Sequence, residues 1–288
     1  TQMTVHLNLL QKQQANLFSY DKGTAYFVDK NTIEIKKEDG SVRRVSADNI
    51  LIATGSRPRY LPHIAIDEQI IMTSDGVKNL TDLPESLVVL GAGVIGCEFA
   101  TIFSNMGRTK VYLIDKADRI LPFEDNDVAE VISESLEKHG ATIHHGSSLK
   151  RMEIKDGKVE YELEYKDGST EIMNVDKALV SVGRVANVEN LGLENAGVKL
   201  NDRGSIWDDD TQTNMSNIYV AGDVTTEMAL VNVGEREARH AVVRMFGPTI
   251  KPLSYQNIST IMFLNPEVAS VGMSEQDCNK KGLAHKVV

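Results

Sequence analysis

The hydrophobic positions of this chain change their spacing several times, and these changes predict an alternation of strands and helices. Apolar residues recur at helical spacing in some segments and alternate with polar residues in others. Helices are predicted at residues 5–19, 97–106, 127–139 and 235–246, and strands at 24–28, 32–36, 41–46, 50–53, 87–90, 111–115, 142–145, 148–155, 159–165 and 171–175. Because strands that alternate with helices are typical of a parallel sheet with helices on both faces, the expected fold class is α/β.

Glycine follows an apolar run at three separate places, which indicates two nucleotide-binding units. One unit is centred on Gly91, and the other is assembled from pieces on either side of it, near Gly55 and near Gly222. Ligands of open α/β sheets bind at the carboxyl ends of strands, so each glycine is well placed to touch a cofactor.

The composition is that of a soluble globular protein of about two domains, with 288 residues of which 25% are charged. With a net charge of −10, the protein has no large positive field that would attract phosphate groups, so neither nucleic acid nor an anionic membrane is expected as a partner. No apolar run is long enough to cross a bilayer, and the first residues lack a signal-peptide pattern. The two cysteines, Cys97 and Cys278, form no disulfide framework, so a cytoplasmic location is expected, and no metal site is predicted.

The stretch GAGVIG that starts at Gly91 fits the pattern G-x-G-x-x-G between a predicted strand and a predicted helix. In this pattern Gly91 allows a tight turn, Gly93 lets the backbone approach a pyrophosphate, and Gly96 lets the helix pack closely on the strand. The helix N-terminus, at Val94 and Ile95, offers free N–H groups to the phosphates. The turn is therefore a candidate dinucleotide site.

Asp115 ends the next strand, at about the ~20-residue spacing that this motif requires. An acid at this position accepts hydrogen bonds from the ribose hydroxyls and repels a 2′-phosphate, which favours NAD over NADP. A glycine-rich turn with a chance acid is the alternative, but strand, glycines, helix and acid are all in register. Lys116 and Arg119 follow, either as ligands of a 2′-phosphate or, more commonly, as solvated surface charges.

Two residues of the first helical turn have competing interpretations. A thiol at a helix N-terminus can have a lowered pKa, but a cysteine such as Cys97 is more often a small buried side chain, so no redox role is assigned to it. Glu98 is favoured by the helix dipole, and this explanation competes evenly with a position near the nicotinamide.

Polar residues also follow two other predicted strands, in the sequences ATGS and AGD. Thr54 and Gly55 belong to the first of these and Asp223 to the second. An acid directly after a buried strand needs polar partners, and sugar-like hydroxyls would serve Asp223 in this way. A helix N-cap is the alternative role for Asp223.

Five ordered motifs, ILIATGSRP, GAGVIGCE, ALVSVGR, NIYVAGDV and PEVASVG, resemble those of the flavin-dependent pyridine nucleotide–disulfide oxidoreductases. The resemblance covers nearly the whole chain and implies a Rossmann-like NAD(P)-binding domain inserted in a partial FAD-binding domain of the same type. The FAD-binding domain is then expected at residues 1–80 and 206–250, and the NAD(P)-binding domain at 81–205. Residues 251–288 are expected to begin a C-terminal dimerisation domain.

On the flavin side, the resemblance implies that Thr54 and Gly55 line the flavin and that Asp223 binds its ribitol chain. The backbone around Met228 and Ala229 would approach the flavin ring or its phosphates. On the dinucleotide side, the three glycines of the turn would receive the pyrophosphate.

The resemblance also implies roles at the nicotinamide end of the dinucleotide. Asp115 would bind the ribose, and Glu98 and Gly183 would flank the nicotinamide. Arg184 would lie near the contact between the two cofactors, and the implied chemistry is hydride transfer from nicotinamide to flavin.

Three parts of the family pattern are missing from the chain. They are the first G-x-G-x-x-G, which holds the FAD pyrophosphate, the C-x4-C pair that follows it, and the closing His-Pro-x-x-x-Glu. The chain is therefore expected to be a piece that is truncated at both ends, whose full-length protein forms a homodimer.

Within the family, the run GCEFATIFSNMG and the following VYLIDKADRILPFEDNDV resemble most the soluble transhydrogenases, which move hydride from NADPH to NAD through FAD. Dihydrolipoamide dehydrogenase is the alternative, because Asp115 suits NAD and the missing segment has room for the cysteines. A non-catalytic dinucleotide-binding module is a third possibility, of a different class.

Overall fold

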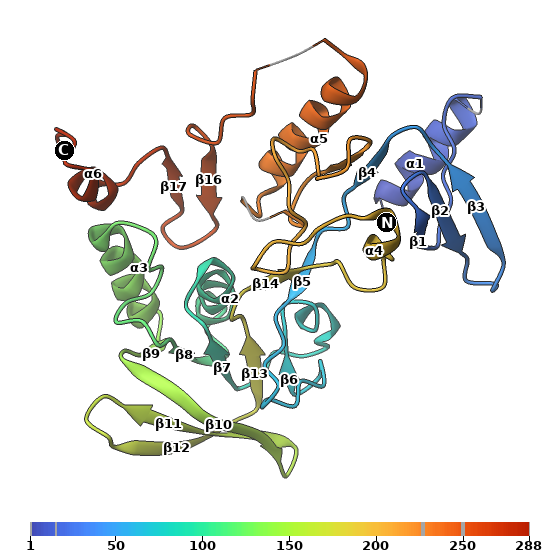
Figure 1. Cartoon of the computed structure of the whole chain (residues 1–288). Coiled ribbons are helices and arrows are strands. Elements are labelled where there is room, and N and C mark those ends of the chain that lie inside the picture. Colours follow the sequence, from blue (N-terminus) through green and yellow to red (C-terminus); the bar gives the residue numbers. More distant parts are fainter. Residues whose placement is uncertain (1, 15, 226–227, 249–250, 288) are drawn as a thin grey trace. The chain divides into compact units, whose positions relative to one another are not determined.

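The computed structural model describes residues 2–14, 16–225, 228–248 and 251–287, which fall into two compact units (Figure 1). Unit 1 consists of Thr1–Ser56 and Ala186–Leu253, and unit 2 consists of Arg57–Val185 and Ser254–Val288. Each unit has hydrophobic core residues of its own. Within the described residues, no helix has the length and apolar character that crossing a membrane requires.

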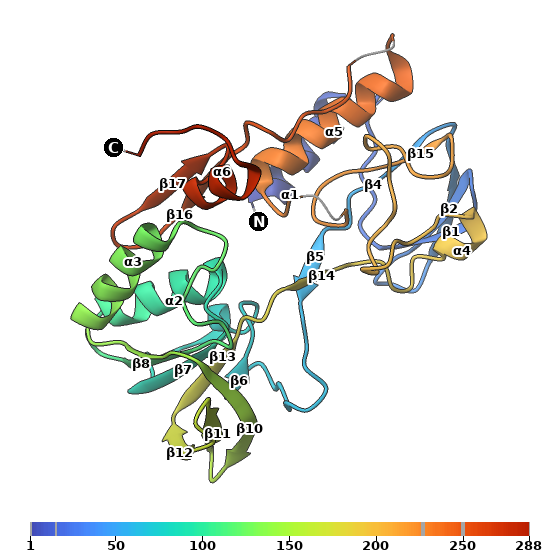
Figure 2. The same ribbon diagram turned by 60° about the vertical axis from the view of Figure 1, so that its left-hand side comes forward.

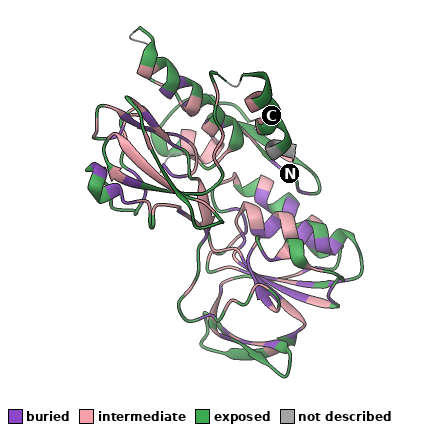
Figure 3. Cartoon of the chain, turned by 90° about the vertical axis from the view of Figure 1, so that its right-hand side faces the viewer, coloured by how far each residue is buried: buried purple, intermediate pink, exposed green. Residues whose placement is uncertain are grey.

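Unit 2 is built on a five-stranded parallel sheet, which confirms the expected α/β class. Its strands, in spatial order, are β6 (Ile71–Met72), β13 (Lys177–Val180), β7 (Ser86–Leu90), β8 (Lys110–Ile114) and β9 (Thr142–His144). Figure 3 shows buried residues concentrated in these strands and on the helix faces beside them. Three consecutive residues of β7, from Leu87 to Val89, are completely buried, as expected for a strand covered on both faces.

The two faces of this sheet are covered by different kinds of structure. One face carries α2 (Val94–Asn105) and α3 (Asn126–Lys138), and the other carries an antiparallel sheet of β10 (Ser147–Lys155), β11 (Lys158–Tyr165) and β12 (Thr170–Val175) (Figure 1). The prediction of helices on both faces is therefore wrong for this unit. Every second residue of β11, including Tyr161 and Leu163, is buried against the parallel sheet, so a half-polar sheet replaces a helix layer.

The C-terminal segment packs on the helical side of unit 2 rather than standing apart. It forms β16 (Ser259–Met262), β17 (Val268–Val271) and α6 (Glu275–Lys281), beside α2 and α3 (Figure 2). Met262 and Leu264 belong to the same core cluster as the buried residues of α2. Asp125 accepts the N–H groups of Glu275 and Gln276 at 2.9 and 3.1 Å, so it also fixes the start of α6.

Unit 1 combines a small antiparallel sheet with one parallel strand pair. The antiparallel sheet contains β1 (Thr24–Asp29), β2 (Thr32–Lys36) and β3 (Val42–Ser46), and the parallel pair contains β4 (Ile50–Ile52) and β15 (Ile218–Val220). The helices of this unit are α1 (Gln2–Gln13), α4 (Leu193–Ala196) and α5 (Val231–Phe246). The pairing of β4 with β15 brings residues that follow Ile52 and Val220 to one edge.

The boundaries between the two compact units lie at 56/57, 185/186 and 253/254, and the expected domain boundaries at 80/81 and 205/206 remain predictions. The chain crosses between the units at β5 (Ser56–Pro58) and β14 (Arg184–Ala186), which pair with each other. Residues 57–80 belong to unit 2 because β6 adds a strand to its sheet, and the helical turn η1 (Val77–Asn79) follows. A two-residue strand is too short to show a period, so the sequence pattern could not place it.

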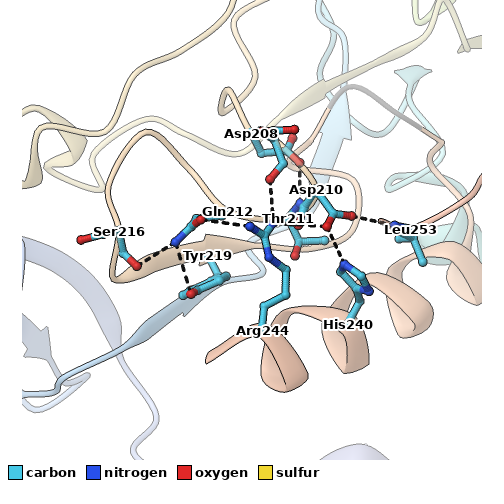
Figure 4. Close-up of polar contacts among 10 residues, drawn as sticks. Asp208, Asp210, Thr211, Gln212, Ser216, Tyr219, His240, Arg244 and Leu253 are labelled. Carbon is cyan, nitrogen blue, oxygen red and sulfur yellow. Dashed lines mark hydrogen bonds and ion pairs between the residues drawn. The ribbon is translucent and has the colours of Figure 1, made fainter. Parts of the chain in front are cut away.

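The helix α5 is anchored through its C-terminal half to the loop before β15 (Figure 4). His240 Nε2 lies 2.9 Å from Asp210 Oδ2, and Arg244 donates to the backbone oxygens of Asp209 and Asp210. Asp210 also accepts the N–H of Leu253 at 2.7 Å. Burial would raise the pKa of Asp210, but the Leu253 amide and His240 outweigh burial and hold that pKa below its usual range.

Candidate functional site

A pocket of about 500 Å³ lies at the carboxyl ends of β7, β8 and β13 in unit 2. Four of the predicted residues line it, namely Gly91, Gly93, Asp115 and Gly183. The pocket is where the fold class places a ligand, because the strand ends leave a crevice there. Its wall also contains Leu61, His63, Ser147 and Leu149 from other segments, and no sequence pattern pointed to these four residues.

The three glycines of the turn meet different surroundings. A Cβ atom on Gly91 would lie 2.6 Å from the backbone oxygen of Ser181, and one on Gly96 would lie 1.9 Å from the oxygen of Gly91. Both positions are therefore closed to side chains by the protein itself. A Cβ on Gly93 would meet no atom within 4 Å, and Gly93 has an ordinary extended backbone with a φ of −77°. The space in front of Gly93 is thus available to a ligand.

Ser181, at the end of β13, ties the glycine turn to the neighbouring strand. Its N–H donates to the oxygen of Leu90 at 2.8 Å, and its Oγ lies 3.0 Å from the oxygens of both Leu90 and Gly91. Sequence analysis missed this residue, although it directly follows the apolar run ALV. A local sequence pattern could not reveal this role, because the hydrogen bonds join residues about 90 positions apart.

Asp115 lines the pocket and also holds the turn in place. Its Oδ2 accepts the N–H of Ala92 at 2.6 Å, and its Oδ1 accepts the N–H of Ala117 at 2.8 Å. A carboxylate oxygen has two lone pairs, so both oxygens retain acceptor capacity for ribose hydroxyls. The structure thus shows that Asp115 holds the backbone of the turn, a role that the ~20-residue spacing did not reveal.

The two cations after Asp115 have different surroundings. The guanidinium of Arg119 donates to the backbone oxygens of Leu121, Pro122 and Glu124 at 2.7 to 3.1 Å. Arg119 is therefore committed to the loop before α3, which is neither of the two roles considered for it. Lys116 lines the pocket, and its side chain is exposed.

Cys97 is a buried side chain of the first turn of α2. It is fully buried, and its Sγ lies 3.4 Å from the oxygen of Ala92. Burial, together with the charge of Asp115, raises the pKa of the Cys97 thiol to about 12. Because a thiolate is the reactive form, this thiol is inert at neutral pH, which agrees with the interpretation as a packing residue.

This difference in environment leads to a measurable prediction for the two thiols. With an aromatic disulfide reagent at about pH 8, Cys278, which is half-buried, reacts first and Cys97 stays protected. We expect one equivalent of released thiolate from the folded chain and two after denaturation. A Cys278→Ser variant that still releases a full equivalent before denaturation would contradict the assigned burial of Cys97.

The predicted residues at the nicotinamide end lie outside the pocket wall, except Gly183. Glu98 Oε1 accepts the N–H of Phe263, in the C-terminal segment, at 3.0 Å. Gly183 has a φ of +104°, and its oxygen accepts the N–H of Arg59 at 3.0 Å. Arg184 is half-buried and begins β14. Val94, Ile95 and Gly96 form the start of α2 behind the turn.

In unit 1, the residues after β4 are fixed by one asparagine. Thr54 Oγ1 donates to the oxygen of Asn187 at 2.7 Å, and Asn187 Nδ2 donates back to the oxygen of Thr54 at 3.0 Å. The N–H of Asn187 donates to the oxygen of Gly55 at 2.9 Å. Asn187 was missed by sequence analysis, since it lies 133 residues away from Thr54.

Asp223 lies at the same edge of unit 1, because β15 pairs with β4. Its Oδ2 accepts a hydrogen bond from the Ser56 hydroxyl at 2.7 Å, so this bond links the segment after β15 to the segment after β4. This edge joins the ATGS and AGD sequences, as the strand pattern indicated. Met228 and Ala229 lie just before α5, and the N–H of Leu230 donates to the oxygen of Met228 at 2.8 Å.

Comparison with known proteins relates this geometry to a family. Residues 2–238 match the family described as "Pyridine nucleotide-disulphide oxidoreductase". A soluble pyridine nucleotide transhydrogenase from Pseudomonas aeruginosa (strain LESB58) is 35% identical over 269 residues, which are 92% of this chain and 56% of the relative. A dihydrolipoyl dehydrogenase from Bacillus subtilis (strain 168) is 34% identical over 269 residues, which are 93% of this chain and 57% of the relative.

Solved structures give the same relationship. LpdA from Mycobacterium tuberculosis superposes with a TM-score of 0.85 at 28% identity, over 96% of this chain and 62% of LpdA. The HOCl-induced flavoprotein disulfide reductase RclA from Escherichia coli superposes with a TM-score of 0.83 at 26% identity, over 96% of this chain and 63% of RclA. The chain therefore spans little more than half the length of the relatives that it matches.

Proposed function

Because the chain belongs to the pyridine nucleotide–disulphide oxidoreductase family, we propose that it is the dinucleotide-binding portion of a flavoprotein that transfers hydride between NAD(P)H and FAD. The resemblance found in the sequence is confirmed at the level of the family. Both curated relatives are named as dehydrogenases or transhydrogenases, which supports an oxidoreductase rather than a passive binding module.

The open space in front of Gly93 is the observation that carries this proposal. Gly91 and Gly96 are required by the protein's own packing, but no described atom explains the glycine at position 93. A pyrophosphate at this place would meet the N-terminus of α2, whose N–H groups and partial positive charge favour anions. Asp115 lines the same pocket and would bind the ribose, with the nicotinamide toward Gly183.

The residues of unit 1 fit one part of a flavin. Thr54, Gly55 and Asp223 lie at the carboxyl ends of the parallel pair β4 and β15, where Asp223 would bind ribitol hydroxyls. The flavin would supply the acceptor for hydride, while the chain holds and orients the two partners. The G-x-G-x-x-G that the resemblance assigns to the FAD pyrophosphate does not occur before Ile50 in this sequence.

Among the activities of the family, we favour soluble transhydrogenation, in which NADPH reduces NAD through FAD. The sequence run from Gly96 to Val128 supports this assignment, as does the 35% identity to the enzyme of that name from P. aeruginosa. Dihydrolipoamide dehydrogenase is the second candidate, supported by nearly equal identity and by the NAD-type acid Asp115. A homodimer in the cytoplasm remains a prediction for either enzyme.

The test uses the full-length gene product that contains this chain. We expect a visible flavin absorption band and, with NADPH as donor, reduction of thio-NAD without any thiol substrate. A protein with the flavin band that acts only with dihydrolipoamide, and loses activity after thiol alkylation, would reject transhydrogenation in favour of the second candidate. A protein that binds NADH but shows no flavin band would instead be a dinucleotide-binding module.

A transhydrogenase must accept NADPH despite Asp115, and Lys116 is the pocket-lining cation that would offset the acid. We expect Lys116→Ala to raise the Kd for NADPH by roughly three- to tenfold, the effect of one partly exposed ion pair, with little change for NADH. Binding is measured by calorimetry at low ionic strength. Lys78→Ala, on η1, is the matched control. An equal change for both dinucleotides would contradict a role at the 2′-phosphate.

A further inference from the structure

A buried carboxylate in unit 1 is not among the residues predicted from the sequence. Glu237 lies on α5 and is only 1% exposed, and its Oε2 accepts the N–H of Gly222 at 2.6 Å. Burying a carboxylate is costly unless hydrogen bonds compensate for the lost water. The distance of 2.6 Å is at the short end for an N–H···O hydrogen bond, so the carboxyl group of Glu237 holds Gly222 closely.

Gly222 forms the turn that directly precedes Asp223. The N–H of Ala221 continues the strand pairing by donating to the oxygen of Ile52 at 3.0 Å. The oxygen of Gly222 accepts the N–H of Thr225 at 2.9 Å, and Gly222 itself has a φ of +78°. The turn is therefore held on both sides of Gly222, and the bond from Glu237 is the part that comes from α5.

The close approach of α5 makes this bond possible. A Cβ on Gly234 would lie 3.2 Å from the Cα of Gly222, so a glycine lets the helix come near the turn. Gly234 and Glu237 are three positions apart and thus lie on the same helix face. Farther along, His240 and Arg244 anchor α5 to the loop before β15, so the carboxylate is carried by a fixed helix (Figure 4).

We propose that Glu237 is a positioning residue for the flavin. By holding the Gly222 N–H, it fixes the turn in the conformation that places the Asp223 carboxylate at the strand ends, 2.7 Å from the Ser56 hydroxyl. Asp223 then meets the ribitol hydroxyls without a prior rearrangement. The proposal rests on the proposed function, because it concerns how this chain holds FAD, and it assigns to Glu237 a contact with the Gly222 backbone rather than with the flavin.

The experiment compares three variants of the full-length protein. Glu237→Met removes the acceptor at similar length, Glu237→Gln keeps a carbonyl oxygen for the Gly222 N–H, and Glu235→Gln is the control at an exposed position of the same helix. Each protein is stripped of flavin and titrated with FAD by fluorescence. NADH affinity is measured on the same samples as a readout of unit 2, and folding is checked by circular dichroism.

We expect Glu237→Met to weaken FAD binding about ten- to hundredfold, the range expected when a buried N–H loses its acceptor. Glu237→Gln should recover most of this loss, and NADH affinity should stay unchanged in all variants. If Glu237→Met does not fold, Glu237→Asp replaces it, since it keeps a carboxyl group but draws that group back from the Gly222 N–H by one methylene.

Two results would overturn the proposal. Wild-type FAD affinity in Glu237→Met, or in the Asp variant that replaces it, would show that FAD binding does not need this anchor on Gly222. A Gln variant that binds FAD as weakly as the Met variant would show that the hydrogen bond to the Gly222 N–H is not what supports FAD binding. Both results leave the proposed function intact. A wild-type full-length protein that binds no FAD at all would instead reject the proposed function and this inference together.

Discussion

The Gly93→Val variant should fold normally and lose dinucleotide binding by at least about a hundredfold, because its side chain fills the space of the pyrophosphate. No described atom lies within 4 Å of a Cβ at this position, and its backbone is one that valine adopts without strain. The cost therefore appears only when a ligand is present. Calorimetry with NADH measures the loss, and thermal unfolding without ligand measures stability.

Gly96→Ala is the matched variant within the same turn. Its methyl group would lie 1.9 Å from the oxygen of Gly91 and 2.8 Å from Ser181 Oγ, so the clash exists in the protein alone. We expect a loss of stability of about 3 kcal/mol or more. Retained NADH binding in Gly93→Val, or loss of its fold, would mean that the space in front of Gly93 has another purpose.

The Asp115→Ala variant should lose both stability and NADH affinity. If Asp115 only contacted the ligand, its loss would lower the affinity and leave the stability unchanged. The N–H of Ala92, which is completely buried, would lose its acceptor at 2.6 Å. An unsatisfied buried donor costs roughly 1–3 kcal/mol, so the free energy of unfolding should fall by about that amount. Denaturant unfolding measures the change.

Binding of the two dinucleotides to Asp115→Ala should change unequally. NADH loses an acceptor for its ribose hydroxyls, whereas NADPH loses an acceptor but also a repulsive charge, so the Kd for NADH should rise more. Asp118→Ala is the control, since Asp118 is an exposed acid of the same loop. Equal losses for NADH and NADPH would assign Asp115 to the turn alone and remove it from the ribose site.

The glycine turn at Gly91, the proposed dinucleotide site, was determined by the sequence because all its parts lie within one short segment. The strand before Gly91, the helix behind it and Asp115 after the next strand are linked by local periodicity and fixed spacing. Such patterns are readable because backbone sterics and the strand and helix periods act over a few residues. The same local logic placed Asp223 and Thr54 at strand ends.

Other parts of the two sites were decided only by tertiary packing. Ser181, Asn187 and Glu237 bind backbone groups that lie between 15 and 133 residues away, and no local pattern encodes such a contact. The start of α5 was expected at residue 235, whereas it begins at Val231. Glycine disfavours the interior of a helix, but close packing against Gly222 accounts for Gly234 within α5.

The covering of the parallel sheet is the broadest feature that only the tertiary structure decided. The sequence determined that β10, β11 and β12 are strands, with an apolar face that is clearest in β11, where apolar and polar residues alternate. It did not determine which surface that face would bury, because the hydrophobic effect is non-directional and any apolar partner of the right shape satisfies it. In the structure, that face packs against the parallel sheet whose strand ends form the pocket.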